Sequence, residues 1–177
     1  MRAAGIAYRA VDIDRLTDLP EIIDVLALTR AAAHAGDRIA WLAVLRSPWI
    51  GLDWSDLHAL VRNDKHSSIW ELLQSAERRQ NLSAFAQSAI ADAMASLQNL
   101  VAPNRIQSLR DRVESCWFAL GGPGLLNDNY AVENVYRYFN VLGKLERAGS
   151  IVDVGELESV LDLEHVSSNE QARVQVL

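Results

Sequence analysis

Apolar residues recur every three or four positions along most of this chain, which is the period of an amphipathic helix. In the segment 17–36, for example, Leu19, Ile22, Ile23 and Leu26 follow this spacing. The pattern predicts eight helices, within residues 17–36, 37–47, 54–63, 69–80, 84–101, 105–120, 128–149 and 153–166.

Residues that start and stop helices support these boundaries. Short polar side chains that cap a helix N-terminus precede most of the segments. The expected caps are Thr17 or Asp18 with Glu21 closing a capping box, Asp37, Asp53 or Ser55, Ser67 or Ser68, Ser83, and Asp153 with Glu156. Gly36, Pro48 and Pro103 are expected to end helices, and "GGPG" at 121–124 is predicted to be a loop.

Near each end of the chain the period changes to two. Residues 6–13 ("IAYRAVDI") and 172–177 ("ARVQVL") alternate as a β-strand does. The predicted fold class is therefore mostly α, a multi-helix domain of about eight helices with a short β-strand near each terminus. Because two strands alone form a marginal ribbon, this order favours a helical domain inserted into a sheet that other residues complete.

The composition excludes several classes of protein and site. Of the 177 residues, 50% are hydrophobic and 23% are charged, and no apolar run has the length of a membrane span or a signal peptide, so we expect a cytoplasmic protein without membrane contact. The single cysteine, Cys116, excludes an internal disulfide and is expected to be a buried packing residue. Four scattered histidines lack metal-ligand spacing, and no phosphate loop, dinucleotide motif or complete catalytic constellation is present.

The charge pattern is ambiguous for nucleic-acid binding. A net charge of −6 disfavours it, because binding phosphates requires clustered lysine and arginine. Basic residues do cluster, however, either as phosphate contacts or simply as solvated helix faces. The clusters are Arg62, Lys65, Arg78 and Arg79, and then Arg105, Arg110 and Arg112.

The stretch "LRSPWIGLDWSDL", residues 45–57, predicts a helix, a tight turn and a second helix. Pro48 enforces an extended step, Gly51 allows the backbone to turn, and Asp53 starts the next helix. Free backbone N–H groups in such a turn are suited to bind a phosphate. The alternative is an ordinary helical hairpin in which Trp49 and Trp54 fill the core.

The same stretch resembles the UvrD-like superfamily 1 DNA helicases, and most closely the RecB and AddA type of helicase-nuclease and related DNA-repair proteins. The segment "AGIAYRAVDI" resembles the family's "AGIPYR" strand, and "VQVL" resembles the strand that leads into the motif "TxHxxKGLE". The resemblance covers residues 4–57 and 172–177. Within the first of these segments the family-matching positions of the motor-domain edge include Glu21, Ile22, Asp24, Leu26 and Arg30.

The resemblance implies a 2B-type accessory domain with pieces of the second motor domain, 2A, at each end. Residues 1–34 would form a motor-domain edge, residues 35–165 the helical accessory domain, and residues 166–177 the strand that re-enters the motor domain. The parent would be an ATP-dependent 3′ to 5′ DNA helicase or helicase-exonuclease of DNA repair and recombination. ATP and Mg²⁺ would bind to the parent outside this segment, so we expect no cofactor and no catalytic activity in the isolated chain.

The implied role is to position duplex DNA or a single/double-strand junction while the motor domains of the same polypeptide consume ATP. The expected DNA-backbone contacts are Arg46, Ser47, Trp49, Gly51, Arg62 and Lys65. The UvrD branch has a "GIG" turn here, of which only Gly51 remains. The alternative is an acidic helical module for protein interaction or autoregulation, with Trp49 and Trp54 as apolar anchors for a partner subunit.

Overall fold

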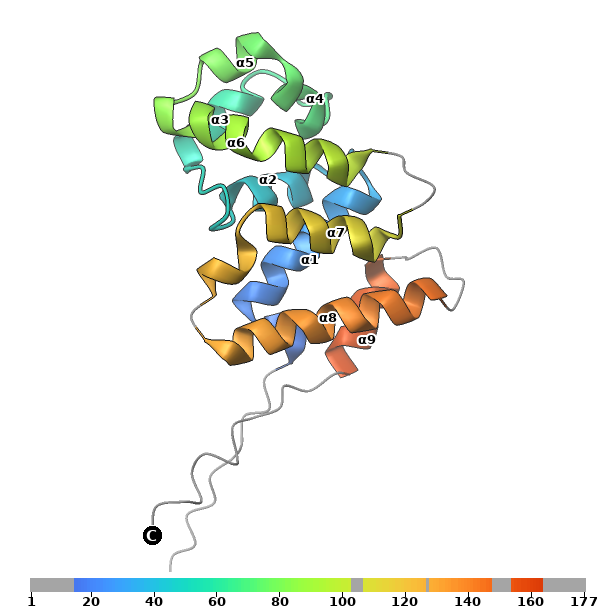
Figure 1. The fold of residues 1–177 in the computed structure, drawn as a ribbon. Helices are drawn as coiled ribbons and strands as arrows, with labels where there is room; N and C mark the ends of the chain where they lie inside the picture. The colour runs from blue at the N-terminus through green and yellow to red at the C-terminus, as the bar shows by residue number, and fades with distance from the viewer. Residues whose placement is uncertain (1–14, 103–106, 127, 148–153, 164–177) are drawn as a thin grey trace, which may run out of the picture.

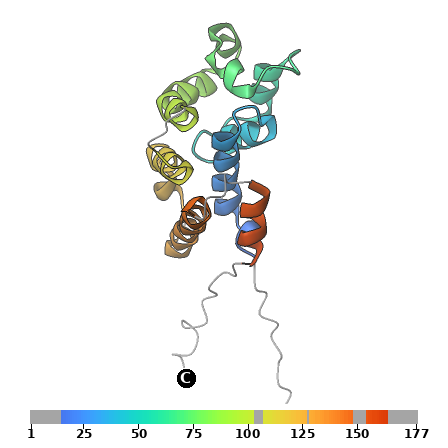
Figure 2. The same cartoon turned by 90° about the vertical axis from the view of Figure 1, so that its right-hand side faces the viewer.

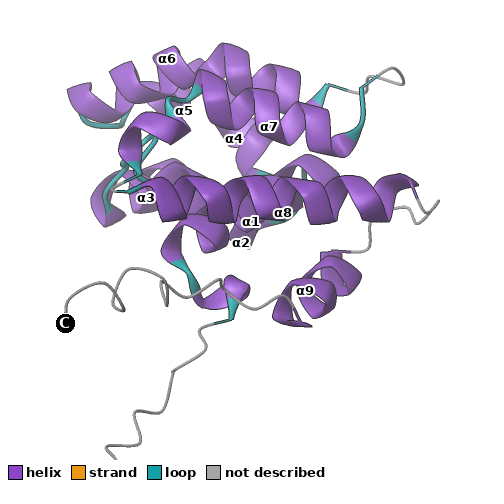
Figure 3. Cartoon of the chain, turned by 60° about the horizontal axis from the view of Figure 1, so that its bottom comes forward, coloured by secondary structure: helices purple, strands orange, loops and turns teal. Residues whose placement is uncertain are grey.

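The computed structural model describes residues 15–102, 107–126, 128–147 and 154–163. Within these ranges the chain forms nine α-helices, two short 3₁₀ helices and no strand, which confirms the mostly α fold class (Figures 1 and 3). The predicted strands at 6–13 and 172–177 lie outside the described residues. The helices are η1 (Leu16–Asp18), α1 (Pro20–Ala33), α2 (Arg38–Arg46), α3 (Trp54–Val61), α4 (Ile69–Gln74), α5 (Ala76–Gln80), α6 (Ala84–Val101), α7 (Leu109–Ala119), η2 (Gly122–Leu125), α8 (Asn129–Arg147) and α9 (Val154–Leu163).

Helix α1 lies at the centre of the molecule and packs against α2, α6, α7, α8 and α9 (Figure 1). Helices α3, α4 and α5 gather at one end of the molecule, whereas α8 and α9 lie at the other. The shared core includes the fully buried Trp41, Trp117, Tyr138 and Phe139. The predicted domain boundary at residue 34 therefore falls between α1 and α2, two helices of one core.

Four of the expected N-caps are confirmed. The side chains of Asp37, Asp53, Ser68 and Ser83 each accept a hydrogen bond from a backbone N–H in the first turn of the following helix. Ser68 also forms the full capping box with Glu71, whose carboxylate accepts from the Ser68 N–H at 2.8 Å. These caps depend only on neighbouring residues, so the sequence was sufficient to predict them.

The cap predicted for α1 is wrong. Leu19 is its N-cap and Pro20 its first residue, while Thr17 and Asp18 belong to η1. The Thr17 hydroxyl instead donates to the Asp162 carboxylate of α9 at 2.5 Å, a tertiary contact. Helix α1 also ends at Ala33, before the predicted stop at Gly36.

Two further predictions need correction. The single helix expected at 69–80 is broken at Ser75, whose hydroxyl accepts from the Arg78 N–H at 3.3 Å and so caps α5. The predicted loop "GGPG" contains η2, since the fixed φ of Pro123 suits a short 3₁₀ turn and Gly121, at φ +79°, reverses the chain after α7. Helix α7 itself begins at Leu109 with Ser108 as its cap, later than predicted.

The beginning and the end of the described chain lie side by side, η1 against α9 (Figures 1 and 2). Besides the bond between Thr17 and Asp162, the Arg30 guanidinium pairs with Glu158 of α9 at 3.3 Å. Near the same helices, the buried Tyr138 hydroxyl donates to the Thr29 hydroxyl at 2.6 Å. The two ends of the described chain thus lie at one place.

Two predictions from composition can be compared directly with the fold. Cys116 is buried, as expected, and burial raises the pKa of its thiol to about 12, so the thiol stays protonated at neutral pH. Among the described helices, none combines the length and the apolar character that crossing a membrane requires.

Candidate functional site

The turn that joins α2 to α3, residues 47–53, is held by its own backbone. The N–H groups of Ile50 and Gly51 donate to the Ser47 carbonyl at 3.1 and 2.8 Å, and the Leu52 N–H donates to the Leu45 carbonyl at 2.9 Å. Gly51 adopts φ +72°, a conformation that favours glycine. These N–H groups are therefore not available to a phosphate, contrary to the physical argument made from the sequence.

Ser47 and Trp49 also have structural contacts in this turn. The Ser47 side chain is buried, and its hydroxyl donates to the Val44 carbonyl at 2.7 Å. Trp49 is half-buried against the hydrophobic core. We conclude that Ser47 and Gly51 shape the turn, whereas Trp49 packs against the core and also lines the grooves beside it.

An exposed cation–π pair flanks the turn. The guanidinium carbon of Arg46, the last residue of α2, lies 4.0 Å from the ring centroid of Trp54, the first residue of α3. Trp54 is 71% exposed, so the interpretation that places it in the core is wrong for this residue. Arginine over an exposed indole presents both a positive charge and a flat aromatic face.

Two more exposed cations, Arg62 and Lys65, follow α3. Trp54 and Arg62 lie at opposite ends of that helix, whose eight residues correspond to about 12 Å of axial rise. Arg46, Trp54, Arg62 and Lys65 are called the basic set below. Arg46, Arg62 and Lys65 are the predicted DNA contacts whose side chains are exposed. Trp54 is added because it is exposed beside Arg46.

Arg38, and the described arginines of the predicted basic clusters other than Arg62, are occupied within the protein. Arg38 donates to the carbonyls of Ser67 and Asp64, and Arg78 donates to the Arg62 carbonyl at 2.5 Å. Arg79 and Arg112 likewise donate to the carbonyls of Leu73 and Leu100, and Arg110 pairs with Glu114 at 3.3 Å. These arginines close loops and helix ends, whereas Arg105 lies outside the described residues.

The loop that carries Lys65 is rigidly organised. Ser67 donates its backbone N–H and its hydroxyl to the Asp64 carboxylate at 2.9 and 2.8 Å, and Arg78 pairs with the same carboxylate at 3.7 Å. These hydrogen bonds from Ser67 lower the pKa of Asp64 to about 2. The loop is therefore fixed by an ionised carboxylate over the whole physiological pH range.

Three grooves meet at Pro48. An apolar groove of ≈ 530 Å³ runs along α2, and its lining includes Ile39, which is 77% exposed, together with Asp24, Leu42, Ala43, Arg46, Ser47, Pro48 and Trp54. A second groove, of ≈ 360 Å³, lies between the turn and α6, where it includes Phe85. One feature of the sequence indicates the apolar groove. Trp41, Val44 and Leu45 define the buried face of α2, and Ile39 is an apolar residue outside that face.

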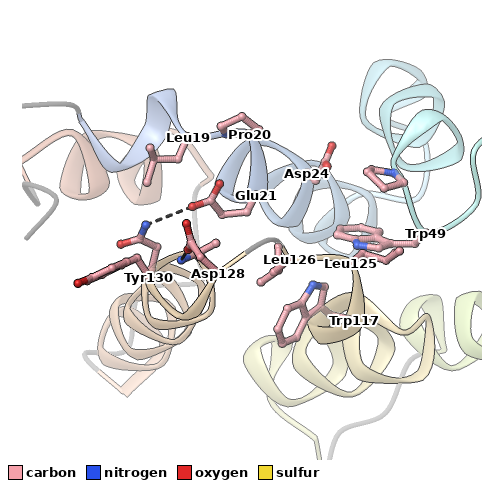
Figure 4. A pocket seen from close by; sticks show the side chains of 13 residues that line it. Leu19, Pro20, Glu21, Asp24, Trp49, Trp117, Leu125, Leu126, Asp128 and Tyr130 are labelled. Carbon is pink, nitrogen blue, oxygen red and sulfur yellow. Dashed lines mark hydrogen bonds between the residues drawn. The ribbon is translucent and has the colours of Figure 1, made fainter. Parts of the chain in front are cut away.

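The third groove, called the acidic groove below, has a volume of ≈ 380 Å³ and lies between α1, the turn, η2 and the start of α8 (Figure 4). Three carboxylates and three aromatic rings face it, and no lysine or arginine lines it among the described residues. Its lining residues are Leu19, Pro20, Glu21, Asp24, Pro48, Trp49, Trp117, Leu125, Leu126, Asp128, Tyr130, Ala131 and Asn134.

Two of these carboxylates have partners and one has none in the described part of the chain. Glu21 accepts from the Asn134 amide at 3.1 Å, a bond drawn in Figure 4, and Asp128 caps α8 by accepting from the Ala131 N–H at 2.7 Å. Asp24 is half-buried and receives no hydrogen bond or ion pair from a described residue. Asp24 also borders the apolar groove along α2, so it lies where the two grooves adjoin.

The family-matching residues Glu21, Asp24 and Arg30 all lie on α1, but they do not form one site. Glu21 and Asp24 face the acidic groove, whereas Arg30 lies near the other end of the helix. There Arg30 bridges Asp37 at 3.1 Å and Glu158 at 3.3 Å. No group of three or more histidine, cysteine, aspartate or glutamate side chains suited to a metal ion occurs among the described residues.

Burial raises the pKa of Asp24 to about 6. Because the carboxyl of an unfolded chain titrates near about 4, the folded state holds this proton more tightly between roughly pH 4 and pH 6. Stability from this group is therefore lost as the pH rises through that window. We expect Asp24→Asn to raise the melting temperature at pH 7 and to change it little at pH 4.

Thermal unfolding of both proteins at the two pH values, with the exposed Asp92→Asn of α6 as control, tests this expectation. Glu21, Asp128 and Arg46 are the other described charged groups that face the same two grooves, and the difference in melting temperature between Asp24→Asn and the unchanged protein isolates the effect of Asp24. An equal change in melting temperature at pH 4 and pH 7 would contradict the assigned role of burial.

No protein-family model matches the chain, and no curated protein matches it.

Proposed function

We propose that this chain is the helical accessory domain of a UvrD-like superfamily 1 DNA helicase or helicase-exonuclease of DNA repair. Support comes from the sequence resemblance over residues 4–57 and 172–177, and above all from one structural observation. Elements η1 and α9, at the two ends of the described chain, are joined by the bond between Thr17 and Asp162, 145 residues apart. A domain inserted into another domain needs its entry and exit points to be close together.

In this proposal the domain positions DNA through the basic set. Arg46, Arg62 and Lys65 would contact phosphates, and Trp54 would stack on a base where the duplex opens into single strands. The separation of Trp54 and Arg62, about 12 Å, corresponds to roughly three to four base-pair steps of 3.4 Å. ATP and Mg²⁺ would bind to the motor domains of the parent, and we assign no residue of this chain to them.

Titration with a fluorescein-labelled duplex that carries a 3′ single-stranded tail tests the proposal, with anisotropy measured over a series of salt concentrations. We expect weak binding at low salt that disappears as salt rises, because counterion release drives phosphate contacts. Each of Arg46→Glu, Arg62→Glu and Lys65→Glu should lower the slope of log affinity against log salt by about one. Trp54→Ala should weaken binding to the tailed duplex more than to a blunt one.

The matched control is Lys144→Glu, the same charge reversal at an exposed lysine of α8, at the end of the molecule opposite α3 (Figure 1). It should leave both the affinity and the salt slope unchanged. The DNA role fails if the unsubstituted 177-residue chain binds no DNA at low salt. It also fails if Lys144→Glu weakens binding as much as Arg46→Glu does. The protein-interaction module then becomes the better account, with the apolar groove of Ile39 and Trp54 as its contact surface.

A further inference from the structure

The acidic groove combines exposed apolar surface with negative charge. Leu125 of η2 and Tyr130 of α8 are 47% and 48% exposed; Leu125 lies beside the half-buried Trp49, and Tyr130 lies at the other end of the groove (Figure 4). Apolar and aromatic side chains exposed in a concave surface are typical of a recognition site for another molecule. The groove adjoins the basic set, because Asp24 and Pro48 also line the apolar groove together with Arg46 and Trp54.

The local structure explains two of the three carboxylates but not Asp24. Glu21 and Asp128 lie at the N-termini of α1 and α8, where helix dipoles favour negative charge, and both have hydrogen-bond partners. Asp24 lies further along α1, half-buried beside Pro48 and Trp49, without a described partner. A carboxylate in such surroundings gains most from a cation that arrives together with apolar groups.

We propose that the acidic groove binds an arginine side chain presented by an apolar segment of a partner protein. The guanidinium would form a bidentate pair with the Asp24 carboxylate, with Glu21 and Asp128 adding negative potential. Trp49, at the same end of the groove as Asp24 (Figure 4), offers an aromatic face on which a planar guanidinium stacks, which favours arginine over the compact ammonium of lysine. Leu125 and Pro48 would contact apolar neighbours of that arginine.

Charge complementarity decides the class of partner. Three carboxylates and no described basic residue face the groove, so the phosphates of DNA would be repelled from it. The inference therefore goes beyond the proposed DNA role and does not depend on it. A protein segment can supply the cation and the apolar groups together.

Binding of synthetic peptides to the full chain tests this inference without any DNA present. The probes are fluorescein-labelled peptides that share one apolar sequence around Leu-Arg-Leu, Leu-Lys-Leu or Leu-Gln-Leu. Anisotropy should show the arginine peptide binding about tenfold more tightly than the glutamine peptide, with the lysine peptide between them, because the charge-assisted bidentate pair requires a guanidinium. Asp24→Asn should remove most of this preference, and Glu21→Gln should reduce it.

The control variant is Glu133→Gln, an exposed carboxylate of α8 that does not line the groove. It should leave the tenfold preference intact. Circular dichroism of each variant establishes that the fold is retained, and Glu21→Gln serves if Asp24→Asn does not fold. Equal binding of the three peptides, an unchanged preference in both groove variants, or full competition by free argininamide at the peptide's own concentration would each overturn the proposal.

Discussion

Replacing Gly122 with alanine should destabilise the protein by about 3 kcal/mol, because the new methyl group would enter space that a buried indole already occupies. A Cβ atom built at Gly122 lies 2.1 Å from Nε1 of Trp117 and 2.4 Å from two of its ring carbons. Trp117 is fully buried and packs edge-on against Phe139 with ring centroids 5.7 Å apart, so it has little room to move. Overpacked cores respond by shifting backbone or leaving preferred rotamers.

Thermal or urea unfolding of Gly122→Ala measures this effect, which corresponds to a fall of roughly 9 °C in melting temperature for a chain of this size. Gly124→Ala is the matched control, since it lies two residues away in the same 3₁₀ helix and its added Cβ would meet no atom within 4 Å. The control should keep nearly the full stability. Similar losses in both variants would show that the 3₁₀ backbone, and not the contact with Trp117, is what requires glycine.

Replacing Asp56 with alanine should cost about 2 kcal/mol, because it removes both acceptors that hold α3 to the start of α6. The buried Asp56 carboxylate accepts from the N–H and from the hydroxyl of Ser83, each at 2.7 Å, across 27 positions of the sequence. Ser83 is itself the N-cap of α6. One carboxylate therefore fixes both the position of α6 and its first turn.

Asp56→Asn keeps an acceptor oxygen at the same place and should lose clearly less stability than Asp56→Ala in urea unfolding. Asp53→Ala is the comparison, because the Asp53 carboxylate caps the N-terminus of α3 and accepts no hydrogen bond from the described residues of α6. A typical N-cap contributes about 1 kcal/mol. A loss for Asp56→Ala no larger than that for Asp53→Ala would refute the tether between α3 and α6.

Much of the helical fold could be predicted because its signals are local. The caps at Asp37, Asp53, Ser68 and Ser83 use hydrogen bonds within three residues, and their helices follow the apolar period. The errors came where a local preference competes with another local preference or with a tertiary contact. At Ser75 the hydroxyl starts a new helix inside a continuous apolar pattern, and at Thr17 a contact with Asp162 replaced the expected cap.

The candidate site was less predictable than the helices. The residue pattern marked the turn, but it left two possibilities for Trp54, which the structure places on the surface under Arg46. The pattern also suggested free backbone N–H groups in the turn. In the structure, the N–H groups of residues 50–52 donate hydrogen bonds to the carbonyls of Ser47 and Leu45. The sequence shows that donors exist, but not whether the folded turn already uses them.

By itself, then, the sequence of this chain determined a mostly helical domain, most of its helix starts, and the turn at 47–53, since all of these depend on residues a few positions apart. Only the tertiary structure decided what surrounds Asp24. The acidic groove joins Glu21 and Asp24 of α1 to Asp128 and Tyr130 of α8, which are separated by more than half of the chain. Which charges face one another across such a distance depends on how the helices pack, and the periodicity of each helix alone carries no record of its partner.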